Sequence, residues 1–259
     1  MTVSIGGTAI RIATSDAVFD EALRAQYAGF IGPDRRDSIR MTVRSILATG
    51  ADPDADIEVK HENGCWVMVR GDFHASYTPA ERTATVHQTA GRYGIDSAIR
   101  IIHSLELAER RGFLLHAASV IRDGRAFLFA GPSGAGKTTI SRLAGEDTHL
   151  LTDEISCVRK CGNTWTAFGT PFAGELAQPG ENLRARAEAL YLLQHGPENQ
   201  LEPLSATAAT RSILRNVLFF AQDSRLSRLL FDTVCEFVES LRVFRLAFVP
   251  DARVWSLIR

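Results

Sequence analysis

The chain has 259 residues, of which 45% are hydrophobic and 23% are charged, and its formal net charge at pH 7 is −1. This composition is typical of a globular protein, and the balanced charge gives no electrostatic reason to expect binding to nucleic acid or to an anionic membrane. The sequence shows no signal-peptide pattern and no apolar run of bilayer-spanning length. We therefore expect a cytoplasmic protein.

The four cysteines include no C-x-x-C pair, which favours free thiols in a reducing compartment. Cys157 and Cys161, with His149 nearby, come closest to a metal-binding pattern. A structural metal site needs a closed set of ligands, and nothing else in this stretch completes one. Buried thiols are the interpretation that we prefer.

The first part of the chain, residues 1–110, alternates short β-like runs with turns and is interpreted as a small, mostly β N-terminal domain that could select a partner. A turn at Asn63-Gly64 between two apolar runs is typical of a β-hairpin. Apolar residues at helical spacing indicate helices elsewhere in this part. The predicted hairpins cover residues 2–14 and 57–71, and the predicted helices cover residues 17–30 and 94–112, with Gly112 as the helix stop.

The second part, residues 111–259, is interpreted as a P-loop domain with a mixed sheet, so that the fold class is α/β with α+β character. Its predicted elements are hairpins at 114–131 and 155–169, helices at 206–221 and 224–241, a strand at 243–249 and a short helix begun by Pro250. The stretch 194–206 is interpreted as a loop because it is the most loop-like segment of this half.

The sequence FLFAGPSGAGKTTISRL at 127–143 contains a phosphate-binding loop. Gly131, Gly136, Lys137 and Thr138 match the pattern G-x-x-x-x-G-K-[ST]. Small residues let successive backbone N–H groups surround a polyphosphate, the next helix adds positive potential, and the lysine neutralises phosphate charge. Lys137 is one of only three lysines in the chain, which favours a functional role for it.

The hairpin before this loop turns at Asp123-Gly124. Pairing residue 122 with residue 125 places His116 opposite Gly131, beside the start of the phosphate loop. Most P-loop proteins flank this strand with parallel neighbours, so an antiparallel hairpin predicts a different, mixed-sheet nucleotide fold. A core histidine is the alternative for His116. Four other histidines have no partner at catalytic spacing, so we interpret them as structural: His61, His74, His87 and His195.

An acidic pair, Asp153 and Glu154, follows two leucines and resembles a Walker-B arrangement. Phosphoryl transfer needs carboxylates there to hold Mg²⁺ and to orient or deprotonate the nucleophile. The following hairpin turns near Gly162-Asn163, and its pairing brings Asp153 close to Phe172. The segment GTPFAGEL therefore returns to the acidic pair, which makes Glu175 a candidate third carboxylate. A surface glutamate is the alternative.

Several classes of P-loop protein are excluded in outline, because the chain has neither the N-K-x-D motif of GTPases nor an L-S-G-G-Q-like stretch of ABC ATPases. His116, the loop 131–138 and the pair Asp153-Glu154 together resemble the HPr kinase/phosphorylase family, whose catalytic domain is similar to phosphoenolpyruvate carboxykinase. The resemblance covers roughly residues 112–175. Within this family, the chain is most similar to the HPr-kinase-related branch, whose members are often linked to modification of small ribosomally made peptides.

The resemblance implies an ATP- and Mg²⁺-dependent kinase. It implies catalytic roles for Asp153 as general base, Lys137 as the stabiliser of the transferring group, and His116 as a hydrogen-bond partner of the acidic centre or phosphate. The residues expected to bind nucleotide phosphates are Gly131, Ser133, Gly134, Ala135, Gly136, Lys137, Thr138 and Thr139, and those expected to hold the metal are Thr138, Glu154 and Glu175.

The expected acceptor is a serine hydroxyl on a small protein or peptide, and the related family suggests a homo-oligomer such as a hexamer. Two alternatives stay open at this point. One is an ATP-binding regulatory or assembly protein that transfers no phosphate, and the other is a kinase of a free small molecule such as serine. The sequence also leaves open whether the reverse phosphorylase reaction occurs, and which of Arg211 and Arg215, if either, contacts phosphate.

Overall fold

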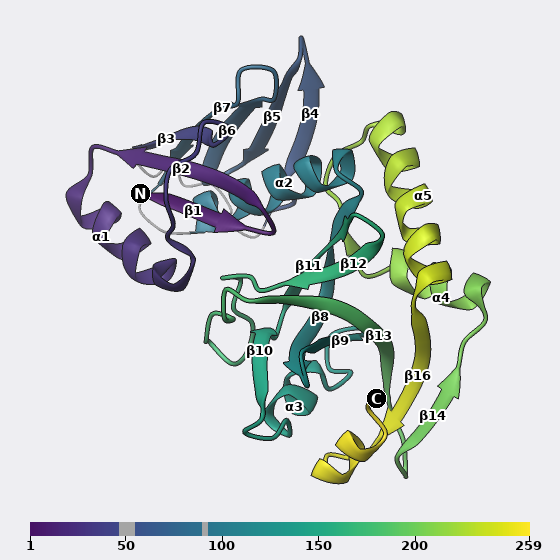
Figure 1. The fold of residues 1–259 in the computed structure, drawn as a ribbon. Helices are drawn as coiled ribbons and strands as arrows, with labels where there is room; N and C mark the ends of the chain where they lie inside the picture. The colour runs from purple at the N-terminus through teal and green to yellow at the C-terminus, as the bar shows by residue number, and fades with distance from the viewer. Residues whose placement is uncertain (47–54, 90–92) are drawn as a thin grey trace. The chain divides into compact units, whose positions relative to one another are not determined.

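The computed structural model describes residues 1–46, 55–89 and 93–259, and these divide into two compact units (Figure 1). The N-terminal unit consists of Met1–Glu106 and Phe219–Ser227, and the C-terminal unit consists of Leu107–Leu218 and Arg228–Arg259. Both units contain a sheet with parallel and antiparallel neighbours, so the predicted mixed α and β character is confirmed. None of the helices in the described parts is long and apolar enough to cross a membrane.

The N-terminal unit is built on a seven-stranded sheet with the strand order β1-β2-β3-β7-β6-β5-β4. Its strands are β1 Thr2–Ile5, β2 Thr8–Thr14, β3 Ile39–Ser45, β4 Glu58–Glu62, β5 Cys65–Arg70, β6 Phe73–Thr78 and β7 Thr83–Gln88. Both predicted hairpins form, as β1/β2 and β4/β5. Asn63 and Gly64 have φ values of 51° and 78°, as a two-residue type I′ turn requires.

The predicted helices of this unit also form, as α1 Ala17–Gln26, followed by the short η1 Ala28–Phe30, and as α2 Tyr93–Glu109. Asp16 caps α1 by accepting a hydrogen bond from the Phe19 N–H at 3.0 Å. The chain leaves α2 through Arg111, which has a φ of 55°. Gly112 is not the helix stop but the first residue of the next strand, where an added Cβ would lie 2.7 Å from the Val158 carbonyl oxygen.

The C-terminal unit is built on a nine-stranded sheet. Its strands are β8 Gly112–Arg122, β9 Arg125–Ala130, β10 Thr148–Thr152, β11 Ile155–Cys161, β12 Thr164–Phe168, β13 Arg184–His195, β14 Gln200–Pro203, β15 Val217–Leu218 and β16 Arg242–Phe248. Its helices are α3 Lys137–Arg142, α4 Ala206–Leu214, α5 Ser224–Ser240, whose first residues belong to the other unit, and η2 Ala252–Ser256. Strand pairings run from β8 to β9, β13, β12 and β11 and back to β8, so these strands form a closed circuit.

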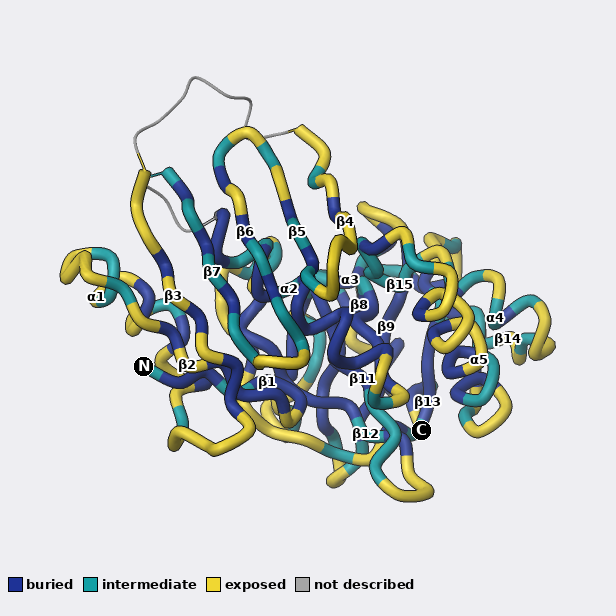
Figure 2. The backbone as a smooth tube through the Cα atoms, turned by 90° about the horizontal axis from the view of Figure 1, so that it is seen from above, coloured by how far each residue is buried: buried dark blue, intermediate teal, exposed yellow. Residues whose placement is uncertain are grey.

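Both predicted hairpins of this unit are confirmed with their registers. In the β8/β9 hairpin, pairing runs from Arg122 with Arg125 to Ala117 with Ala130, around Asp123 and Gly124 at φ values of 50° and 71°. The β11/β12 hairpin turns at the predicted position. Figure 2 shows that β8 and β9 are buried along most of their length, which places the start of the phosphate loop at the edge of a packed core.

The largest departure from the sequence prediction is β13, which was assigned to no element. It lies parallel to both β9 and β16, and its burial alternates from Arg184 to Ala189, whereas Ala189–Leu193 is a continuous apolar run that is mostly buried. Its alanines and leucines favour helix locally, and strand pairing overrides that preference. The stretch predicted as a loop at 194–206 contains β14, which pairs with β16.

The helix predicted at 206–221 is wrong in length, because α4 ends at Leu214 and β15 follows it. The carbonyl of Asn216 accepts a hydrogen bond from the His116 N–H at 2.7 Å, and Val217 then pairs with Leu115 of β8. These pairings draw the chain out of the helix and onto the sheet. The predicted helix at 224–241, the final strand and the turn of helix after Pro250 are confirmed as α5, β16 and η2.

The segment from 169 to 183 crosses β10 in close contact with its backbone. Thr170 and Glu181 donate N–H hydrogen bonds to the carbonyls of Leu151 and Leu150, at 3.1 and 2.8 Å. Gly180 is buried between these two contacts, and an added Cβ would lie 1.7 Å from the Leu151 carbonyl oxygen. A glycine is therefore required for this segment to reach the turn after β10.

We predict that Gly180→Ala destabilises the protein by about 2 kcal/mol or more, because the added methyl group overlaps a backbone carbonyl that cannot move freely. Urea unfolding monitored by tryptophan fluorescence measures the change. Gly29→Ala is the matched control, because a Cβ at Gly29 would meet nothing within 4 Å. Equal stability of the two variants would contradict the tight crossing.

Candidate functional site

The phosphate loop occupies residues 131–136, between the carboxyl end of β9 and the start of α3. Gly134 and Gly136 have φ values of 77° and 101°, which side chains rarely adopt. A Cβ at Gly136 would also lie 2.6 Å from the ring of Phe248, and one at Gly131 would lie 2.8 Å from the Cβ of Ala135. The glycines are thus needed for both conformation and space, as the motif predicts.

Lys137 points back across this loop and is only 7% exposed. Its Nζ donates hydrogen bonds to the carbonyls of Gly131 and Pro132, at 3.0 and 3.2 Å. Burial lowers the pKa of the ammonium, while the negative charges of Glu154 and Glu175 raise it. The lysine is therefore held over the loop, within the electric field of two carboxylates.

The other predicted loop residues take distinct places around the lysine. Ser133 is exposed at the tip of the loop, and Ala135 is buried in the core together with Phe129. Thr138 and Thr139 are half-buried in the first turn of α3, where backbone N–H groups lack partners within the helix. The backbone thus presents small residues and donors at the end of β9, the arrangement that a polyphosphate requires.

His116 lies on β8, one residue beyond the paired Ala117 and Ala130 and so beside the start of the loop, but its N–H pairs with Asn216 and not with the predicted Gly131. Its Nδ1 is 3.6 Å from Oε1 of Glu154, and its side chain is 27% exposed. Burial and the positive charge of Lys137 lower the pKa of His116, whereas Glu154 raises it. His116, Lys137 and Glu154 therefore influence one another electrostatically at one end of β8 and β9.

The acidic pair lies in a tight turn between β10 and β11 that Thr152 holds in place. The Thr152 hydroxyl accepts N–H hydrogen bonds from Glu154 and Ile155, both at 3.2 Å, and donates one to the Phe172 carbonyl at 3.4 Å. Ala117 of β8 donates its N–H to the Glu154 carbonyl at 3.1 Å. The turn is thus fixed to the strand that carries His116.

The two carboxylates of the pair have different environments. Asp153 is 1% exposed, and its oxygens accept hydrogen bonds from the N–H groups of Gly174 and Leu176, at 2.9 and 2.8 Å. The Glu154 side chain is 32% exposed and faces His116. Asp153 therefore anchors a neighbouring loop, while Glu154 is the carboxylate that an incoming ligand can reach.

The segment GTPFAGEL returns to the acidic pair, as the second hairpin predicted. A Cβ at Gly174 would lie 2.6 Å from Oε2 of Glu154, so the segment passes directly against that side chain. Glu175, the next residue, is exposed and acts electrostatically on Lys137. The structure thus brings the predicted third carboxylate to the same place as the lysine.

His195 is a site residue that the sequence analysis missed. Its Nε2 is 2.7 Å from the carbonyl oxygen of Gly134, in the middle of the phosphate loop. The pairing of Leu192 with Ala130 aligns the carboxyl end of β13 with that of β9 and so carries His195 there. Recognising 184–195 as a strand parallel to β9 would have been the only means of finding it.

The two arginines of α4 are separated by the structure. Arg211 lines a groove of about 500 Å³ formed by α4 and α5, together with Phe231 and Glu239. Arg215 follows the last residue of α4 and directly precedes Asn216, whose carbonyl accepts the His116 N–H. Arg215 is therefore next in sequence to the residue that pairs with His116, whereas Arg211 lies in the groove.

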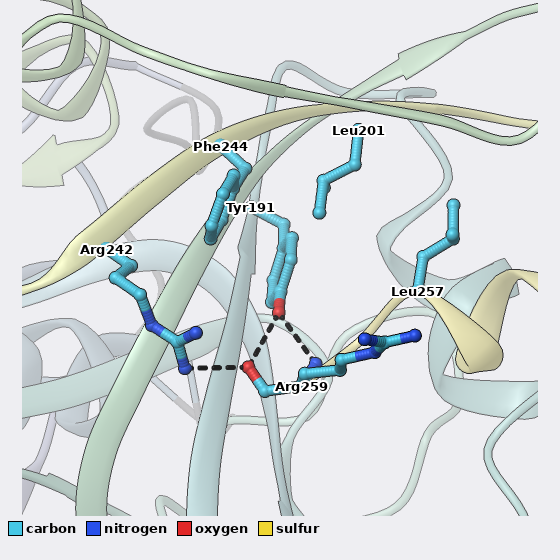
Figure 3. A pocket seen from close by; sticks show the side chains of 6 residues that line it. All are labelled: Tyr191, Leu201, Arg242, Phe244, Leu257 and Arg259. Atoms are coloured by element: carbon cyan, nitrogen blue, oxygen red, sulfur yellow. Dashed lines mark hydrogen bonds between the residues drawn. The ribbon is translucent and has the colours of Figure 1, made fainter.

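A second cavity, of about 190 Å³, lies apart from these residues (Figure 3). It is lined by Tyr191, Leu201, Arg242, Phe244, Leu257 and Arg259. The polar groups at one end of this cavity are hydrogen-bonded to one another. The Tyr191 hydroxyl accepts a hydrogen bond from the Arg259 N–H at 3.2 Å, and Arg242 donates one to the Arg259 carbonyl at 2.9 Å. This cavity thus includes none of the predicted site residues.

A metal-binding cluster of three or more His, Cys, Asp or Glu side chains is not found among the described residues. Cys157 is fully buried, and burial raises the pKa of its thiol to about 12. Mg²⁺, by contrast, needs no such cluster, because it binds through one or two carboxylates, waters and phosphate oxygens. Thr138, Glu154 and Glu175 offer the hard oxygen ligands that Mg²⁺ prefers, and both carboxylates act electrostatically on Lys137, the residue before Thr138.

The lowered pKa of His116 predicts an acid-sensitive fold. An unfolded chain protonates this histidine near its usual pKa of 6.5, before the folded protein does, so stability falls as the pH drops below that value. We expect His116→Gln to lose less stability than the wild type between pH 7.5 and 5.5 in urea unfolding. His74→Gln, at an exposed position of β6, is the control and should behave as the wild type. An unchanged pH dependence in His116→Gln would contradict this assignment.

Comparison with known proteins adds one family assignment. None of the curated proteins compared with the chain matches it. Among solved structures, the Hpr(Ser) kinase/phosphatase from Coxiella burnetii is similar over 49% of this chain and 90% of that chain, with 14% sequence identity and a TM-score of 0.27, too low to establish a shared fold. The sequence profile described as "SynChlorMet cassette protein ScmC" matches residues 84–259, more than half of the chain. The chain belongs to the ScmC family.

Proposed function

We propose that this protein is a kinase that transfers the γ-phosphoryl group of a nucleoside triphosphate, with ATP as the expected donor, to a hydroxyl group. One observation carries the proposal: Lys137 of the phosphate loop lies in the fields of Glu154 and Glu175, and both Lys137 and Glu154 act on His116. A loop that binds phosphate, a lysine and free carboxylates are the parts that phosphoryl transfer requires.

In the proposed reaction, the acceptor oxygen forms a bond to the γ-phosphorus while the bond from that phosphorus to the β,γ-bridging oxygen breaks. The nucleoside diphosphate leaves with the bridging oxygen, and the proton of the acceptor hydroxyl passes to a carboxylate. Lys137 stabilises the negative charge on the transferring group. Because a hydroxyl is a weak nucleophile at neutral pH, the proton acceptor and this charge stabilisation should contribute most of the rate.

We assign proton acceptance to Glu154 in place of Asp153, the residue that the sequence suggested. Both oxygens of Asp153 bind backbone N–H groups, and the residue is 1% exposed, which suits an anchor better than a base. Glu154 is open to a ligand and lies beside His116. This assignment leaves Thr138 and Glu175 to hold Mg²⁺ with the phosphate oxygens. Bound there, Mg²⁺ would neutralise charge on the phosphates.

Arg215 is the arginine that we propose for the phosphate contact, because it directly precedes Asn216, whose carbonyl accepts the His116 N–H. The opposite reaction, phosphate removal, would run through the same residues in reverse.

The acceptor that we propose is a serine on a small protein or peptide. The resemblance of residues 112–175 to HPr kinases supports it, as do the exposed residues Ala173 and Glu175 in the segment beside Glu154, which leave room for a polypeptide. Free serine as acceptor, and ATP binding without transfer, are the other outcomes of the experiment below. A homo-oligomer, a cytoplasmic location and a partner-binding role for residues 1–110 stay predictions.

The proposed activity predicts that the protein, with Mg²⁺, transfers labelled phosphate from [γ-³²P]ATP to a discrete polypeptide of the source cell. Lys137→Ala should lower this transfer at least about a hundredfold, because the charge stabilisation is lost. Arg142→Ala, at the other end of α3, is the control for altered charge near the loop. Label on free serine would identify a small-molecule kinase. ATP binding by wild type with no labelled product would contradict the kinase.

A further prediction distinguishes the roles of Asp153 and Glu154. Glu154→Gln should lower the transfer rate by about two to four orders of magnitude and leave ATP affinity nearly unchanged, because only the proton acceptor is lost. Asp153→Asn should lower both the rate and the melting temperature, because two charge-assisted hydrogen bonds weaken. Glu198→Gln, at an exposed position outside the site, should match the wild type. The opposite pattern, a stable Asp153→Asn without activity and an active Glu154→Gln, would return the base to Asp153.

A further inference from the structure

We infer that His195 is a positioning residue that orients the phosphate loop for nucleotide binding through a hydrogen bond to the Gly134 carbonyl. The inference rests on the proposed function only in its second part, the effect on nucleotide affinity. The distance between Nε2 of His195 and the Gly134 carbonyl oxygen is 2.7 Å, which is that of a direct hydrogen bond. A carbonyl oxygen can only accept, so Nε2 of His195 carries the proton.

The direction of one backbone N–H follows from this contact. In a trans peptide unit, the C=O of one residue and the N–H of the next point in opposite directions. Holding the Gly134 carbonyl toward His195 therefore turns the Ala135 N–H away, toward Pro132, whose carbonyl accepts it at 3.1 Å. Lys137 binds the same Pro132 oxygen at 3.2 Å. The hydrogen bond from His195 thus directs the Ala135 N–H toward the side of the loop where Lys137 lies.

This peptide unit is thus held by two hydrogen bonds, one from its own N–H to Pro132 and one from His195 to its carbonyl, and packing adds little at Gly134. Gly134 has a φ of 77°, and a Cβ added there would meet nothing within 4 Å, so sterics do not determine the conformation of its tip. The other glycines are fixed by packing, Gly131 against Leu193 and Gly136 against Phe248. In the loop, Gly134 is the glycine that is positioned by a hydrogen bond from a neighbouring strand and not by packing.

The position of His195 is itself determined by the sheet. Its strand pairs in parallel with β9 on one side and with β16 on the other, where His195 itself is opposite Phe248. The same two strand ends therefore supply Leu193, Phe248 and His195 to the three glycines of the loop. The imidazole is exposed, so substituting it should change the loop without collapsing the core.

The experiment compares His195→Gln, whose amide can replace the Nε2 donor, with His195→Met, which has similar length and no donor. Hydrogen–deuterium exchange of the peptide containing residues 131–136 is measured without added nucleotide. We expect exchange to be about fivefold faster in His195→Met and unchanged in His195→Gln, in line with the loss of one hydrogen bond. His149→Met, at another exposed histidine, is the control and should match the wild type.

Equal exchange in His195→Met and the wild type would overturn the inference, whether or not the protein binds ATP. Equally fast exchange in His195→Gln and His195→Met would also overturn it, because the donor would then not matter. Calorimetric titration with Mg-ATP gives the second readout, where we expect a Kd about fivefold higher in His195→Met and restored in His195→Gln. Failure of the wild type to bind Mg-ATP would refute the proposed function, while the exchange result still decides the role of His195.

Discussion

The parallel alignment of β9 with β13, and of β13 with β16, is the constraint on which the rest of the site depends. Carboxyl ends of parallel strands meet at one edge of a sheet, and here that edge carries the phosphate loop. Each glycine of the loop then meets a residue from a neighbouring strand end. The conformation of the loop is therefore a property of the sheet, and the motif alone would not specify it.

A second, polar constraint links the acidic turn to the segment beside it. Thr152 and Asp153 are buried, and their side chains bind the backbone of residues 172–176 while Thr152 also closes the turn. Buried polar groups of this kind require their partners, because leaving one unpaired is unfavourable. The pair therefore combines an anchoring Asp153 with a reachable Glu154, and Glu175 comes to the site as part of the same unit.

Short-range patterns predicted those parts of the structure that local geometry determines. The turns at Asp123-Gly124 and Gly162-Asn163 fixed two registers, and from them followed the places of His116 and of the segment carrying Glu175. Residues 184–195 were not assigned in this way: the first half, RARAEA, alternates as a strand does, but the apolar run after it does not, and its alanines and leucines also suit a helix. With β13 missed, the approach of His195 to Gly134 was also missed.

The sequence could not predict which of Asp153 and Glu154 is enclosed, and the reason is a different one. Adjacent carboxylates look equivalent in a motif, and only the path of the chain at Gly174 and Leu176 decides which one is enclosed. The two arginines of α4 are a similar case. The sequence did not distinguish them, but α4 ends at Leu214, so Arg215 belongs to the connection that reaches β8.

The closed circuit of strand pairings has a consequence for biosynthesis. β9 ends at residue 130 and its second neighbour, β13, begins only at residue 184. While the intervening chain emerges from the ribosome, one edge of β9 has unpaired backbone groups and apolar side chains, a combination prone to wrong association between chains. Contacts between strands so distant in sequence also form slowly. Efficient maturation of this protein should therefore depend on protection of the nascent chain, for example by a chaperone that binds extended apolar segments.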